Sequence, residues 1–145
     1  MGVNGQLFEN EVLRVFVPEG WKLVCGTDSD GKVSPKKLYI CKGAQSELEI
    51  FSRACVSVFY YGKNEIYVPT KWFYDNVQDI EPFACGNRLW EGYTCTSLGY
   101  PYTMLTATYN GATFQVMVLR ENGEHKISLD DADVQAIIES IDSCE

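Results

Sequence analysis

The order of apolar and polar positions along the chain predicts a series of strands that begins near the N-terminus. Residues Val12–Val17 are β-branched and aromatic, and they stop at Pro18–Gly20, which is typical of a strand followed by a turn. Residues Ala54–Tyr61 become apolar on both faces toward their end. A strand of that kind is expected at the centre of a sheet.

The chain between residues 88 and 120 is predicted to form an antiparallel meander. Three apolar and aromatic stretches, Arg88–Ser97, Tyr100–Tyr109 and Ala112–Arg120, are separated by short polar turns. The dipeptide at Asn110 and Gly111 is a strong hairpin signal, because both residues tolerate the positive φ of a type I′ turn. We therefore expect three consecutive strands that pair with one another.

The C-terminal segment carries helical spacing. Val134, Ile137, Ile138 and Ile141 recur at i, i+3, i+4 and i+7, and residues Ser128–Asp131 before them fit a capping pattern. The sequence therefore predicts an amphipathic C-terminal helix.

A short middle helix is also predicted, directly after Pro69. Thr70 is able to cap its free amides, and Phe73, Val77 and Ile80 recur at i, i+4 and i+7. Strands that are followed by a closing helix indicate the α+β class. We expect one domain over residues 1–145, with an antiparallel β-sheet meander, the C-terminal helix and the short middle helix.

Charge and hydropathy narrow the classes of partner. The chain has 145 residues, a net charge of −8 and a pI of about 4.6, so its overall field repels polyanions and predicts no nucleic acid partner. No apolar run approaches the roughly 20 residues that span a bilayer, so no membrane insertion is expected. Residues Met1–Gln6 lack the pattern of a secretory signal, and we expect a cytoplasmic protein. The alternative is an exported protein whose signal peptide is absent from this sequence.

Six cysteines leave the redox state open. They are Cys25, Cys41, Cys55, Cys85, Cys95 and Cys144. An even number would fit up to three disulfides in a secreted protein. With no secretory signal and no N-x-S/T sequon, reduced thiols are the preferred interpretation.

The chain shows no assembled catalytic, metal or cofactor motif. Its single histidine, His125, lies in a polar turn, no two cysteines have metal-ligand spacing, and glycine-rich phosphate motifs are missing. We therefore assign no catalytic residue, no metal and no cofactor, and expect a protein that is not an enzyme. A hydrolase with an unrecognised carboxylate pair stays open as an alternative, although no spacing selects a pair.

Aromatic residues supply the candidate binding surface. They make up 13% of the chain, and the candidates are Trp72, Tyr74, Trp90, Tyr100 and Tyr102. Rings of this kind pack in cores, but exposed ones mark binding sites. The first hypothesis is a non-catalytic domain that docks to another protein through this aromatic and apolar patch. The alternative is a carbohydrate or small-ligand binding module that stacks a ring on Trp90 or Tyr102.

One family has a similar arrangement. Residues Val15–Trp21, the strand meander and the terminal Ile137–Ile141 together resemble the Mog1/PsbP-like group of small α+β domains. The resemblance implies an antiparallel sheet with helices packed around it. It also implies docking functions, such as binding a small GTPase, an oxygen-evolving complex or, in bacterial relatives, protein clients. It transfers no binding residue, and the Gly26–Lys36 loop and the six cysteines depart from the usual pattern. The oligomeric state is not predicted.

Overall fold

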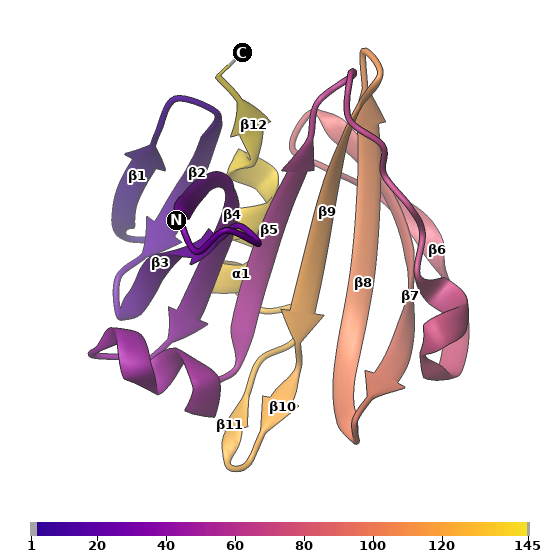
Figure 1. The fold of residues 1–145 in the computed structure, drawn as a ribbon. Coiled ribbons are helices and arrows are strands. Elements are labelled where there is room, and N and C mark those ends of the chain that lie inside the picture. Colours follow the sequence, from indigo (N-terminus) through magenta and orange to yellow (C-terminus); the bar gives the residue numbers. More distant parts are fainter. Residues whose placement is uncertain (1–2, 145) are drawn as a thin grey trace.

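The computed structural model describes residues 3–144 and consists mainly of β-strands (Figure 1). Strands hold 57% of the chain and helical segments 11%. The seven longest strands are β3 (Trp21–Thr27), β4 (Val33–Lys42), β5 (Cys55–Tyr61), β6 (Asp75–Cys85), β7 (Arg88–Ser97), β8 (Tyr100–Tyr109) and β9 (Ala112–Leu119). The others are β1 (Gly5–Glu9), β2 (Leu13–Pro18), β10 (Glu121–Asn122), β11 (His125–Lys126) and β12 (Asp142–Ser143). The helical segments are α1 (Ala132–Ser140) and two 3-10 helices, η1 (Glu47–Ser52) and η2 (Lys71–Phe73).

The seven long strands form one antiparallel sheet in the order β3-β4-β5-β9-β8-β7-β6. The predicted meander is confirmed, because β7 pairs with β8 and β8 pairs with β9. Asn110 and Gly111 connect the last two strands with φ values of 51° and 82°, the positive values that a type I′ turn needs. The prediction of a central strand at Ala54–Tyr61 is also confirmed, since β5 lies between β4 and β9.

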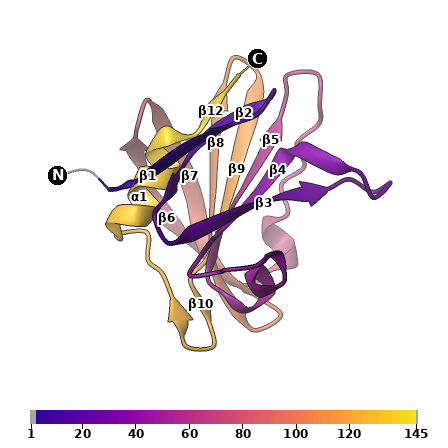
Figure 2. The same cartoon turned by 90° about the vertical axis from the view of Figure 1, so that its left-hand side faces the viewer.

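The predicted C-terminal helix is α1, and it covers one face of the sheet. Its apolar residues Val134, Ile137 and Ile138 are buried in a core that includes Val58 and Val116 of the central strands. A small sheet, β1-β2-β12, lies on the same side as α1, whereas η1, η2 and the β3–β4 hairpin project on the other side (Figure 2). The two faces of the large sheet therefore have different environments.

The α+β prediction is wrong, because the fold is mainly β. The described residues hold one α-helix, α1, and the segment predicted as a middle helix forms a single 3-10 turn, η2, followed by the edge strand β6. The pairing of β6 with β7 explains the spacing of Val77 and Ile80, whereas Phe73 lies in η2 and is exposed. Between Ile80 and Phe83 the strand advances three residues while β7 advances two, from Gly92 to Trp90.

This extra residue is a β-bulge, and a second one lies between Asp75 and Gln78. Ile80 and Phe83 both pack against the core, three residues apart instead of two. A bulged strand therefore imitates the spacing of a helix. Within residues 3–144, no helix is long and apolar enough to cross a membrane.

Candidate functional site

The face of the large sheet opposite α1 carries a row of side chains that runs across the strands. Tyr39 pairs with Ser57, Ser57 with Met117, Met117 with Met104, and Met104 with Tyr93. Successive residues of a strand point to opposite faces, and the neighbours of this row point into the core under α1. We call this second face the groove face.

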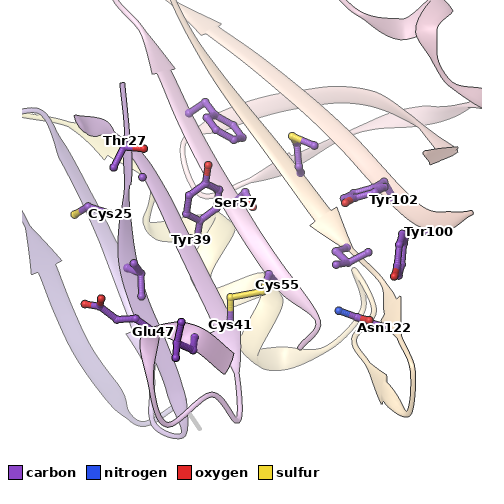
Figure 3. Close-up of a pocket in the computed structure, with 16 residues that line it drawn as sticks. Cys25, Thr27, Tyr39, Cys41, Glu47, Cys55, Ser57, Tyr100, Tyr102 and Asn122 are labelled. Atoms are coloured by element: carbon purple, nitrogen blue, oxygen red, sulfur yellow. A yellow bond between two sulfur atoms is a disulfide. The ribbon is translucent and has the colours of Figure 1, made fainter. Parts of the chain in front are cut away.

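A groove with a volume of about 790 Å³ lies on the groove face. Its floor is formed by β4, β5 and β9, which contribute Tyr39, Phe59, Met117 and Leu119 among others. Residues of β3 and η1 form one wall, and β8 with the β10–β11 hairpin forms the other. Figure 3 shows Glu47 of η1 on one side of the groove and Tyr100, Tyr102 and Asn122 on the other. The volume is in the range of known ligand sites.

A disulfide between Cys41 and Cys55 lies in the floor of the groove (Figure 3). The two residues are direct partners on β4 and β5, with Cα atoms 4.2 Å apart. Together with Ala44 and Tyr39 they form a small apolar cluster that is separate from the main core. The preference for reduced thiols is therefore wrong for this pair. The other four cysteines, Cys25, Cys85, Cys95 and Cys144, are free.

The lining of the groove is mostly apolar and carries little charge. Burial raises the pKa of the Cys25 thiol and of the Tyr102 hydroxyl, so both groups stay neutral at neutral pH. Of the described residues that line the groove, Glu47 alone has a charged side chain. The groove thus offers an apolar floor, a few neutral polar groups and one carboxylate at its wall. It does not offer the pair of carboxylates that glycoside hydrolysis requires.

A cluster of tyrosines lies beside the groove on the same face. Tyr74 packs on Tyr93 with ring centroids 6.5 Å apart, and Tyr61 packs on Tyr67 at 5.2 Å. The Lys71 ammonium lies 5.4 Å from the centroid of the Tyr93 ring. Burial raises the pKa of Tyr93 and of Tyr67. The segment before β6 therefore covers part of the groove face with its own aromatic packing.

The structure separates the five predicted surface aromatics. Trp90 has no exposed surface, and its indole Nε1 donates a hydrogen bond to the Cys85 carbonyl at 3.4 Å, so this residue belongs to the core. Tyr100 and Tyr102 line the groove. Trp72 is 74% exposed on η2, and Tyr74 is half-buried in the tyrosine cluster. Two of the predicted residues thus lie in the groove, Tyr74 lies against Tyr93 on the same face, and Trp72 is exposed on η2.

Sequence reasoning missed the floor of the groove. Phe59, Met117 and Leu119 were expected as parts of strands and not as site residues, although β5 and β9 are apolar on both faces. A strand with two apolar faces signals either a second covered face or a binding surface. The apolar residues on both faces of β5 and β9 are therefore the sequence pattern that indicates the groove floor.

Comparisons with known proteins add no family to these observations. No protein-family model matches the chain, and no curated protein matches it with significance. The resemblance to the Mog1/PsbP-like group therefore stays a hypothesis that rests on the residues quoted for it. In the part of the chain that the structure describes, no three His, Cys, Asp or Glu side chains are grouped as a metal site would need.

Proposed function

We propose that this protein is a binding domain that holds an apolar segment of another protein in the groove. The groove floor supports this proposal, because Tyr39, Phe59, Met117 and Leu119 form an apolar surface on the face that α1 does not cover. Burial of aromatic side chains contributes strongly to binding, and methionine adapts its shape to varied partners.

Exposed apolar side chains at the groove wall and beyond it favour a polypeptide over a small molecule. Leu48 is 83% exposed on η1, Leu98 is 94% exposed in the β7–β8 turn, and Phe73 is 78% exposed on η2. These three segments lie toward the same end of the sheet (Figure 1). A small ligand that fills the groove leaves Leu98 and Phe73 in water, whereas a polypeptide segment is long enough to cover them as well as Leu48. A partner that covers these side chains removes apolar surface from water, which favours binding.

The charge of the protein indicates the chemistry of the partner. Glu47 is the charged side chain at the groove wall, and the whole chain has a net charge of −8. A basic residue beside the apolar segment would lie close to this carboxylate, and the overall field would speed the approach of a basic partner. The proposed ligand is therefore an apolar segment that carries a Lys or Arg.

Site-specific photo-crosslinking tests this proposal. The photoreactive residue benzoylphenylalanine replaces Leu48 in one variant and Leu7 in a matched control. Both leucines are exposed, but Leu7 lies on β1, away from the groove. Each variant is irradiated in lysate of its native source, and the crosslinked peptides are sequenced by mass spectrometry. We expect position 48 to crosslink to an apolar segment with an adjacent basic residue. Position 7 should give no crosslink to that segment.

The outcomes separate the alternatives. The same peptides crosslinked from both positions, or only polar peptides from position 48, would refute the proposal. A crosslinked sugar or small molecule at position 48 would instead establish the ligand-binding alternative.

A further inference from the structure

The Cys41–Cys55 disulfide joins the two ends of the segment that forms one wall of the groove. Cys41 lies near the end of β4 and Cys55 begins β5, and the connection between these strands contains η1. Glu47 and Leu48 of η1 line the groove. The covalent bond and this wall are therefore parts of one chain segment.

Packing also couples the wall to the disulfide. Ala44, in the connection, is buried against both cysteines and Tyr39 in the small apolar cluster. Polar contacts of the connection include the pair of Arg53 with Glu49 at 2.7 Å and the hydrogen bond that the Asn122 side-chain amide donates to the Arg53 carbonyl at 3.3 Å. Polar contacts near the surface contribute little to holding a segment in place. The disulfide with its cluster is thus an apolar attachment of the wall to the sheet, and Ala54, next to Cys55, is buried in the main core.

We infer that this disulfide is a redox-sensitive clasp, and that its reduction loosens η1 and weakens binding in the groove. The statement about binding rests on the proposed function. A disulfide restricts the freedom of the loop that it closes, and the restriction disappears when the bond is broken. The cysteine pair would still be neighbours in the β4–β5 ladder, so the sheet stays formed while the wall gains freedom.

The reductant reaches the disulfide through the groove, because both cysteines line it although they are buried. A small dithiol is a suitable reductant. Its thiolate attacks one sulfur, the Cys41–Cys55 bond breaks, and a mixed disulfide forms. The second thiol then closes the dithiol into its own cyclic disulfide and leaves Cys41 and Cys55 as two thiols. A ligand in the groove blocks this route and slows the reduction.

Hydrogen exchange and dye binding test the inference. The full chain is compared before and after treatment with dithiothreitol, with alkylation and mass spectrometry to verify that Cys41 and Cys55 are reduced. We expect amide exchange in residues 43–54 to speed up by about tenfold or more, while exchange in β8 and β9 stays unchanged. We expect the affinity for Nile red, a neutral apolar dye, to fall by about tenfold. Saturation with the dye should slow the reduction.

The Cys41→Ala/Cys55→Ala variant is the control. The amides of its residues 43–54 should exchange rapidly with or without dithiothreitol. The dithiol should therefore have no effect on exchange in this variant. Unchanged exchange in residues 43–54 after verified reduction of the wild-type chain would overturn the inference, and that measurement does not need the variant to fold. If neither redox form binds the dye or the segment found by crosslinking, the proposed function fails, while the exchange result still decides whether the wall responds to reduction.

Discussion

The guanidinium of Arg88 lies over the ring of Phe114, with its Cζ 4.3 Å from the ring centroid. The same group donates hydrogen bonds to the Ile141 carbonyl at 3.3 Å and to the Asp142 carboxylate at 2.5 Å. The Arg88 side chain is only 11% exposed. One side chain of β7 thus joins the sheet to the C-terminal end of α1 by stacking and by charge.

Replacing Arg88 by lysine should destabilise the protein. An ammonium group cannot stack as a flat guanidinium does, and it cannot reach both acceptors with the same geometry. We expect Arg88→Lys to lower the free energy of unfolding by about 1–2 kcal/mol, measured by urea denaturation. Arg14→Lys is the matched control, because Arg14 makes an exposed ion pair with Glu9 and its replacement should have no measurable effect. Equal losses in the two variants would contradict the role given to Arg88.

Alkaline pH should destabilise the fold through buried tyrosines of the groove face. Burial raises the pKa of Tyr93, Tyr67 and Tyr102 above the ordinary value of 10.0. The unfolded chain therefore loses these protons at a lower pH than the folded chain. The contribution of these tyrosines to the free energy of unfolding is constant below about pH 10, and the free energy of unfolding falls as the pH rises above that value. Urea denaturation from about pH 9 to about pH 12 should show this fall, and Tyr93→Phe should reduce its slope. An unchanged slope in Tyr93→Phe would mean that Tyr93 is not linked to unfolding.

Gly92 permits a close approach between β7 and β8. A Cβ atom at this position would lie 1.8 Å from the Met104 carbonyl oxygen, and a backbone oxygen cannot move away by rotation of a side chain. We expect Gly92→Ala to lower the free energy of unfolding by at least about 3 kcal/mol. In the control, Gly43→Ala, the new methyl group meets no atom within 4 Å. In that variant the alanine must adopt a positive φ, which costs about 1 kcal/mol. Calorimetry of both variants would compare them directly, and similar losses would refute the steric explanation.

The elements that the sequence predicts correctly are those with local signals. Asn110 and Gly111 determine their hairpin through their own backbone preferences, and the apolar spacing of α1 matches an unbroken helix. The first part of β6, up to Ile80, has the spacing of a helix because its bulges depend on how it pairs with β7. Asn76, with a positive φ of 54°, and Pro82 lie at these two bulges, but they indicate bulges only once the segment is known to be a strand.

The candidate site could be predicted only in part for a similar reason. Alternation separates the two faces of β7, but both faces hold aromatic residues, so the sequence does not say that Trp90 points to the core. The pairing of Cys41 with Cys55 depends on the register of β4 and β5, which places the two residues opposite each other. Tyr100 and Tyr102 both line the groove, because alternate residues on one strand share a face, and their role in binding stays a prediction.

The Glu47 carboxylate at the groove wall should contribute to the affinity for the partner. With the segment found by crosslinking as a labelled peptide, Glu47→Lys should weaken binding by about tenfold in low salt, because a basic residue then faces a lysine. The loss should shrink as salt rises, since exposed charges are screened within about 8 Å at physiological ionic strength. Glu11→Lys is the control, because it changes the net charge equally but lies between β1 and β2, outside the groove. If both variants lose the same affinity, the net charge of the protein attracts the partner and Glu47 makes no specific contact. If only Glu47→Lys loses affinity, the basic residue of the partner lies at η1, and the direction of the bound segment along the groove follows.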